Sequence, residues 1–249
     1  CAAKQIMNSN VEPYFKLARF VRPVGTLLLL WPTHAALWMA SEGVPATDLL
    51  IVFIIGTVLM RAAGCVINDI ADRRLDGHVA RTVTRPLAQG MVSSRKAMVF
   101  FAVLVILAGM LLLFLNSLTR WLAAAGLLIA VIYPFMKRWT YLPQVVLGAA
   151  FSWGLVMAFS AVQGVVPATA WLLFVASLMW IVAYDTMYAM VDRDDDLKIG
   201  IKSTAILFGP ADRIMIGILQ VSVLAALCLL GDQLGYSVFY FLGITAAAV

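Results

Sequence analysis

The chain has 249 residues and a formal net charge of +5, and it is 63% hydrophobic but only 12% charged. Ordinary globular domains are about half apolar and roughly a quarter charged, so this composition excludes a typical water-soluble fold. The basic residues lie in short segments between apolar runs rather than in one patch, so we expect no nucleic-acid partner.

Apolar runs recur along the chain, and a transmembrane helix needs about 20 such residues. In chain order they predict membrane-spanning helices at about 24–40, 49–70, 97–115, 121–135, 142–162, 170–190 and 213–230, with a further run from about 237. That last run is too short to span, so we expect a truncated C-terminus. None shows the alternation of a barrel strand. The prediction is an all-α, polytopic transmembrane helix bundle, about eight helices of which are visible, forming a single domain over 1–249.

Positive charge is distributed unequally between the two ends of these helices. All but two of the 18 Lys and Arg residues fall in the N-terminal arm or in the segments that follow the second, fourth and sixth spans. The exceptions are Arg61, inside the second span, and Arg120. Because cytoplasmic loops are enriched in Lys and Arg, we expect the N-terminus and these segments to face the cytoplasm.

The second span runs into the first of two aspartate-rich motifs, which extends from Asn68 to Asp76. If the helix continues through it, Asn68, Asp72 and Asp76 stand at i, i+4 and i+8 and project from one face. The motif then presents a stripe of oxygen ligands at the end of a span.

The sixth span runs into the second motif, between Asp185 and Asp196. Here Asp185, Tyr188, Asp192 and Asp196 stand at i, i+3, i+7 and i+11, which again places them on one helix face. The two spans are therefore expected to end in equivalent stripes.

Carboxylates at this spacing repel one another and, at the end of a helix, oppose its dipole, so a bound cation is expected. Oxygen ligands without His or Cys favour Mg²⁺ over Zn²⁺, and Mg²⁺ commonly completes its shell with phosphate oxygens. The predicted metal ligands are Asn68, Asp72, Asp76, Asp192 and Asp196. The alternative, solvated charges paired with neighbouring arginines, explains one such motif better than two.

Each motif is followed by a basic loop, which suggests two loosely repeated halves of about 1–115 and 116–249. Arg85 lies in the first loop, and Lys198 and Lys202 lie in the second. Lys137 follows Tyr133 by one helical turn at the end of the fourth span. Cations beside two metal-binding stripes predict a diphosphate site.

Arg61 lies inside the second span, where a charged residue is costly and therefore a functional candidate. It stands seven residues before Asn68 and thus on the same face, about 10 Å deeper. A guanidinium there suits the carboxylate of a small acceptor. A purely structural ion pair is the other interpretation.

These residues resemble the UbiA superfamily of intramembrane aromatic prenyltransferases. Its N-D-x-x-D-x-x-x-D signature is matched by Asn68, Asp69, Asp72 and Asp76, its second motif by Asp185, Asp192 and Asp196, and its Y-x-x-x-K element by Tyr133 and Lys137. The local strings are most similar to members that act on 4-hydroxybenzoate in bacterial ubiquinone biosynthesis. The resemblance covers essentially the whole chain and implies nine helices around a central cavity.

The resemblance also implies a reaction at the bacterial inner membrane. A polyprenyl group would pass from polyprenyl diphosphate to the ring carbon ortho to the hydroxyl of 4-hydroxybenzoate, with Mg²⁺ as cofactor and lipid around the protein. The implied catalytic residues are Asp72, Asp76, Asp192 and Asp196; the implied substrate-binding residues are Arg22, Arg61, Asn68, Arg85, Tyr133, Lys137, Asp185, Tyr188, Lys198 and Lys202.

Three other functions remain open from the sequence. The acceptor could be another aromatic compound. The segment from Asp76 to Gly90 overlaps part of the CDP-alcohol phosphotransferase motif, but Arg73 and Ser94 stand where that motif needs aspartates. A transporter would also carry intramembrane charge, although its binding site is expected at the bilayer midplane rather than at helix ends.

Overall fold

The computed structural model describes residues 11–21, 23–78 and 82–248, and within these ranges the chain is helical without any strand. The helices are α2 (Glu12–Leu17), α3 (Val24–Ser41), α4 (Thr47–Asp72), η1 (Asp76–His78), α5 (Ser94–Leu111), η2 (Leu112–Phe114), α6 (Ser117–Trp139), α7 (Pro143–Gln163), α8 (Ala168–Ile199), α9 (Thr204–Phe208), η3 (Gly209–Ala211), α10 (Asp212–Gln233) and α11 (Val238–Ala247). The all-α prediction is confirmed.

Six described segments are long and apolar enough to cross a membrane. They are Thr47–Asp72, Ser94–Phe114, Ser117–Trp139, Pro143–Gln163, Ala168–Ile199 and Thr204–Gln233. The first predicted span is a helix, α3, but it is not among the six. Pro32, His34 and two tryptophans within its 18 residues lower its mean hydropathy below that of the others. The run predicted from about 237 forms α11, which has 10 residues.

The bundle is organised around α7, which packs against α3, α6 and α8. Leu37 of α3 and Leu155 and Phe159 of α7 have at most 1% of their surface exposed, and they form the centre of one hydrophobic cluster. A second cluster joins α2 and the start of α5 to α4, which packs against α5. Both clusters include residues of α4, the first near its start and the second in its later half, so that helix is packed along most of its length.

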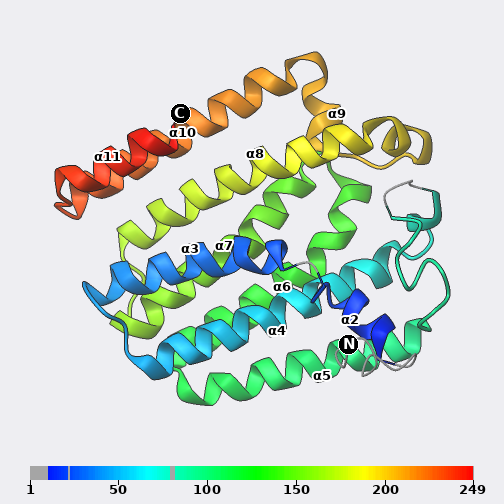
Figure 1. The fold of residues 1–249 in the computed structure, drawn as a ribbon, viewed down its shortest axis with the longest axis horizontal. Coiled ribbons are helices and arrows are strands. Elements are labelled where there is room, and N and C mark those ends of the chain that lie inside the picture. Colours follow the sequence, from blue (N-terminus) through cyan, green and yellow to red (C-terminus); the bar gives the residue numbers. More distant parts are fainter. Residues whose placement is uncertain (1–10, 22, 79–81, 249) are drawn as a thin grey trace, which may run out of the picture.

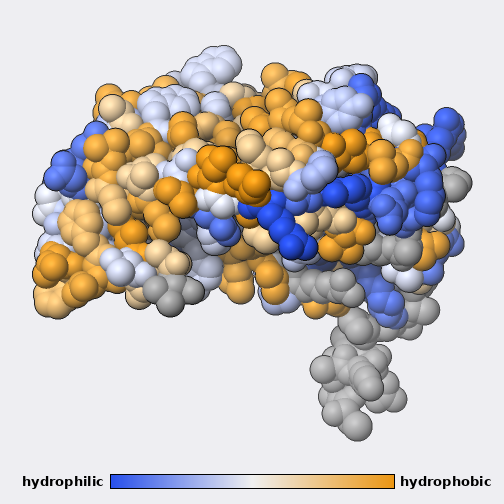
Figure 2. Space-filling view, turned by 90° about the horizontal axis from the view of Figure 1, so that it is seen from above, coloured by the Kyte–Doolittle hydropathy of each residue, from blue (hydrophilic) through white to orange (hydrophobic). Residues whose placement is uncertain are grey.

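The helices run side by side, and the ends of α4 and α8 lie at the same end of the bundle (Figure 1). The segments that follow α4 and α8, and the N-terminal helix α2, all gather at this end, where the sequence places most of the cations. Figure 2 shows hydrophilic residues concentrated there, whereas much of the remaining visible surface is hydrophobic. The fold thus brings the two aspartate motifs together.

The two motif-bearing helices end differently. Helix α4 stops at Asp72, where the Leu75 backbone N–H donates to the Asp72 carbonyl at 2.7 Å and Arg138 donates to the Ala71 carbonyl at 2.6 Å. The expectation that the helix continues to Asp76 is wrong, because that residue begins η1. Helix α8 does continue through its motif and ends at Ile199, where the following Gly200 has a φ of 72° that favours glycine.

Candidate active site

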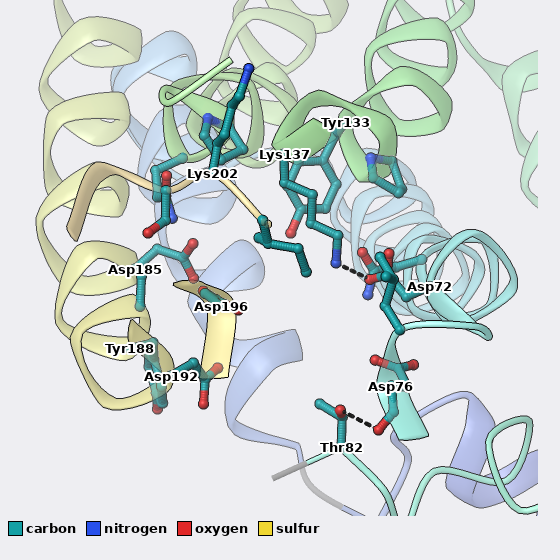
Figure 3. A pocket seen from close by; sticks show the side chains of 18 of the residues that line it. Asp72, Asp76, Thr82, Tyr133, Lys137, Asp185, Tyr188, Asp192, Asp196 and Lys202 are labelled. Carbon is teal, nitrogen blue, oxygen red and sulfur yellow. Dashed lines mark hydrogen bonds and ion pairs between the residues drawn. The ribbon is translucent and has the colours of Figure 1, made fainter. Parts of the chain in front are cut away.

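A polar pocket of about 150 Å³ lies between the ends of α4 and α8. Asp72 and Asp76 form one wall, and Asp185, Tyr188, Asp192 and Asp196 form the opposite wall (Figure 3). Asn68, Tyr133, Lys137 and Arg85 complete the lining together with Thr82, Gln144 and several others. Residues separated by more than 100 positions in the sequence therefore share one small space.

The first wall is already neutralised in part by cations from other segments. Lys137 of α6 donates to Asp72 Oδ2 at 2.5 Å, while Asp72 Oδ1 is buried without a hydrogen-bond partner. Arg85 Nη1 lies 2.9 Å from both carboxylate oxygens of Asp76, and Thr82 donates to the Asp76 carbonyl at 2.9 Å. These contacts keep the Asp76 side chain at the pocket, although the residue lies beyond the end of α4.

Asp76 shows the electrostatic cost of burying a carboxylate beside another one. Burial raises the pKa of its carboxyl above the ordinary value, the Arg85 guanidinium opposes that rise, and the nearby Asp72 carboxylate adds to it. A cation bound beside Asp76 would favour its charged form. The protein thus supplies carboxylates whose ionisation a positive ligand stabilises.

The second wall consists of side chains from the single helix α8. Asp196 is buried with 9% of its surface exposed, whereas Tyr188 is 57% exposed. On another side of the helix, Arg193 donates through Nη2 to Asp212, the first residue of α10, which also accepts from the backbone N–H of Arg213 at 2.6 Å. This ion pair ties the charged end of α8 to α10.

Beneath the polar pocket lies a much larger cavity of about 1210 Å³, lined largely by apolar side chains from α3 to α8. Five residues line both spaces, namely Asn68, Arg85, Tyr133, Asp185 and Tyr188. A ligand with an anionic head and a long apolar tail fits this pair of spaces, because each part meets a lining of matching polarity.

Arg61 lines the large cavity as the sequence predicts. Its guanidinium carbon lies 5.7 Å from the centroid of the Phe151 ring, and Nη1 donates to the Cys65 sulfur. Its Nε atom is buried without a hydrogen-bond partner. A partly buried guanidinium that lines the cavity can bind an anion there through its other N–H donors.

The other predicted cations have different positions. Lys202 borders the polar pocket, but its Nζ donates to the Trp139 carbonyl at 3.2 Å and points away from the carboxylates (Figure 3). Lys198 does not line either space, because its side chain is 72% exposed and contacts Asp195 at 3.2 Å. Arg22 lies outside the described residues.

The walls fit a divalent cation, although they do not form a ready-made cluster. Among the described residues, no three His, Cys, Asp or Glu side chains come together as a metal site. The donors are hard oxygens on facing walls, and Asp72 Oδ1 has no partner. Mg²⁺ typically binds through one or two carboxylates plus substrate phosphates, which is what two separated walls can offer.

Asp69 and Gln144 were not predicted as site residues. The Gln144 side-chain oxygen accepts from the backbone N–H of Thr204 at 3.0 Å, which fixes the start of α9 beside the pocket. Asp69 belongs to the quoted signature, but helix phase alone directs it away from the stripe. Only its burial with arginines from distant segments shows its importance.

Comparisons with known proteins agree with this architecture. The UbiA prenyltransferase family model matches residues 29–249. A 4-hydroxybenzoate octaprenyltransferase of Aliivibrio fischeri (strain MJ11) is 58% identical over 240 residues, covering 96% of this chain and 84% of that protein. One of Pseudomonas syringae pv. tomato is 58% identical over 235 residues, covering 94% of this chain and 79% of that protein.

Solved structures share the fold at lower identity. The apo structure of a UbiA homolog from Aeropyrum pernix K1 superposes with a TM-score of 0.81 at 24% identity, covering 91% of this chain and 86% of that one. A UbiA homolog from Archaeoglobus fulgidus bound to GPP and Mg²⁺ gives a TM-score of 0.71 at 19% identity, covering 89% of this chain and 78% of that one. Sequence, fold and site together identify this chain as a member of the UbiA prenyltransferase family.

Proposed function

We propose that the protein transfers a polyprenyl group from polyprenyl diphosphate to the ring carbon ortho to the hydroxyl of 4-hydroxybenzoate, a step of ubiquinone biosynthesis. The observation that carries this proposal is the junction of a polar, carboxylate-walled pocket with a large apolar cavity. The 58% identical relatives named 4-hydroxybenzoate octaprenyltransferase support the same reaction. The UbiA homolog bound to GPP and Mg²⁺ supports the donor class and the metal.

The donor diphosphate binds in the polar pocket, and its polyprenyl chain lies in the large cavity. Asn68, Asp72, Asp76, Asp192 and Asp196 hold Mg²⁺, which supplies electrostatic stabilisation of the leaving diphosphate. Arg85 and Lys137 add fixed positive charge to the diphosphate oxygens, because both side chains line the pocket beside the first wall. Asp185, Tyr188 and Tyr133 border the point where head and tail meet.

At that junction the bond between the allylic carbon and the diphosphate oxygen breaks. The ring carbon ortho to the acceptor hydroxyl forms a new bond with the allylic carbon, and the displaced ring proton passes to a pocket carboxylate or to the diphosphate. Arg61, which lines the large cavity, binds the acceptor carboxylate through its guanidinium. The apolar lining excludes water, which would otherwise capture the allylic cation.

The orientation follows from the charge distribution. The basic loops and both motifs lie at one end of the bundle, and the positive-inside bias assigns that end to the cytoplasm. This charge distribution supports the proposal that the protein lies in the bacterial inner membrane, with its N-terminus and active-site loops cytoplasmic. Soluble 4-hydroxybenzoate and Mg²⁺ then reach the pocket directly.

The test is an assay of purified protein in lipid nanodiscs with Mg²⁺, polyprenyl diphosphate and 4-hydroxybenzoate, with mass spectrometry of the products. We expect the C-prenylated acid, and addition of excess EDTA should abolish its formation. Parallel reactions contain a CDP-alcohol, other phenolic acceptors, or liposomes loaded with organic anions. Faster conversion of another acceptor, consumption of the CDP-alcohol, or transport of the organic anions without any prenylated product would each contradict the proposed reaction.

A further inference from the structure

Asp69 is fully buried, with 0% of its surface exposed, yet it lines neither the polar pocket nor the large cavity. Its Oδ1 accepts from Arg19 Nη2 at 2.9 Å and lies 3.2 Å from Arg85 Nη1, while Oδ2 has no hydrogen-bond partner. Removing a carboxylate from water is unfavourable unless partners compensate it. Neither contact with solvent nor contact with a ligand in these spaces explains why a charged side chain is buried here.

Arg85 connects Asp69 to the pocket. The same Nη1 atom lies 2.9 Å from both oxygens of Asp76, and the arginine lines both the polar pocket and the large cavity. Asp76 faces the pocket and is a predicted metal ligand, whereas Asp69 stays behind it. When Asp76 binds a cation, its hold on Arg85 weakens, but Asp69 can keep the arginine in place.

Arg19 ties Asp69 to the N-terminal segment. Its φ of 59° lies in the left-handed region, which is unfavourable for a residue with a side chain. The preceding Leu17 and Ala18, with 0% and 3% of their surface exposed, are buried in the cluster that includes Val66 of α4. Packing and the ion pair with Asp69 offset the backbone strain. One carboxylate thus joins α4, the N-terminal segment and the loop that carries Arg85.

We propose that Asp69 is a positioning residue, which holds Arg85 toward the donor diphosphate without touching the donor or the metal. The inference rests on the proposed function, because it takes the polar pocket as the diphosphate site. At metal sites, residues that orient the ligands typically contribute 10- to 100-fold to affinity or activity, and we take the lower end of that range for a residue that orients a phosphate-binding arginine. An effect of this kind passes through Arg85 and is therefore lost when Arg85 is absent.

The experiment measures binding of a non-cleavable prenyl thiodiphosphate to the full chain in nanodiscs with Mg²⁺, by calorimetry and without acceptor. Asp69→Asn keeps the shape of the side chain and is expected to weaken donor binding roughly tenfold. Arg85→Gln should weaken it at least as much, and the double variant should bind no more weakly than Arg85→Gln alone. The affinity for 4-hydroxybenzoate and the Mg²⁺ concentration for half-maximal donor binding should stay unchanged in Asp69→Asn.

Arg95→Gln is the matched control, because it removes an exposed positive charge at the start of α5. The donor affinity of Arg95→Gln should remain within about twofold of wild type, because salt screens the interaction of a solvent-exposed charge with the donor. Wild-type affinity in Asp69→Asn, or additive losses in the double variant, would overturn the proposal. A shifted Mg²⁺ requirement in Asp69→Asn would make Asp69 a metal ligand instead.

If Asp69→Asn does not yield folded protein, Arg85→Lys gives an independent measurement. A single ammonium cannot reproduce the planar fork that serves two carboxylates and a phosphate, so roughly tenfold weaker donor binding is expected. Wild-type affinity in Arg85→Lys would show that charge alone suffices and that positioning is unnecessary. Because no turnover is measured, a wild-type protein that binds donor but forms no product would reject the proposed reaction without deciding this inference.

Discussion

The two walls of the polar pocket reach similar chemistry by different construction. On the first wall, α4 ends at Asp72 and Asp76 lies in the following η1. Lys137 of α6 contacts Asp72, and Arg85 of the loop before α5 contacts Asp76. On the second wall, α8 continues to Ile199, so helix phase alone aligns Asp185, Asp192 and Asp196. The first wall depends on tertiary contacts and the second on one regular helix.

This difference separates two ways of stabilising clustered carboxylates. The first wall is partly neutralised before any ligand binds, because Lys137 and Arg85 contact its aspartates directly. On the second wall, α8 packs against α7 and α10, and the Arg193–Asp212 ion pair ties its charged end to α10. Substitutions can test whether the walls nevertheless contribute equally to turnover.

The largest effect is expected from removing one carboxylate of either wall. Asp72→Ala and Asp192→Ala should each lower kcat by about 10³-fold, the loss typical of a group that stabilises developing charge. Turnover in nanodiscs measures this loss, and recovery in the membrane fraction serves as the control for insertion. A near wild-type rate in either variant would remove that wall from the metal site.

The next largest effect is expected at Arg61, a cation inside the span of α4 that has no counterpart in α8. Arg61 lies deeper on α4, and Arg61→Ala should raise the KM for 4-hydroxybenzoate by roughly 10- to 100-fold, because it removes charge-assisted hydrogen bonds to a carboxylate. The KM for the polyprenyl donor should change much less. Arg61→Lys keeps the charge and should give an intermediate KM for the acid. Equal effects on both substrates would contradict an acceptor role.

Helix α8 can be loosened without touching its pocket residues. Arg193→Gln breaks the ion pair with Asp212 and should lower kcat roughly tenfold, since it releases the end of α8 that presents Asp192 and Asp196. Asp212→Asn should have a similar effect, and the double variant should be no worse than the more affected single variant. Full additivity would show that the two residues act separately.

The sequence predicts the second wall better than the first, for a physical reason. A regular helix repeats every 3.6 residues, so the positions of Asp185, Asp192 and Asp196 follow from local spacing. The predicted helical position of Asp76 is wrong, because α4 ends at Asp72. The turn after Asp72 and the hydrogen bond from Arg138 to the Ala71 carbonyl cannot be inferred from the spacing of the aspartates.

Distant partners limited the prediction of the cations in the same way. Lys202 occupies the expected loop, but the Trp139 carbonyl and the Tyr141 ring, 5.3 Å from Nζ, direct its charge away from the pocket. Asp69 was not assigned a role, because its partner Arg19 stands 50 residues earlier in the chain. The apolar lengths, by contrast, follow from bilayer thickness, and every predicted run forms a helix in the described residues, although α3 is not among the six candidate spans.

The smallest expected effect concerns Gly25, which lies against Arg61. A Cβ added there would lie 2.9 Å from Nε of Arg61 and nearer still to its Nη2, which is closer than van der Waals contact allows, so the guanidinium would have to move. Because an arginine side chain can shift, Gly25→Ala should leave the protein folded but displace the guanidinium and raise the KM for 4-hydroxybenzoate by about threefold, or roughly 0.7 kcal/mol. Gly43→Ala, which places its Cβ near only one backbone oxygen, is the control and should leave that KM unchanged. An unchanged KM in Gly25→Ala would mean that acceptor binding does not require the present position of Arg61. Acceptor binding by α4 would then no longer distinguish the first wall from the second.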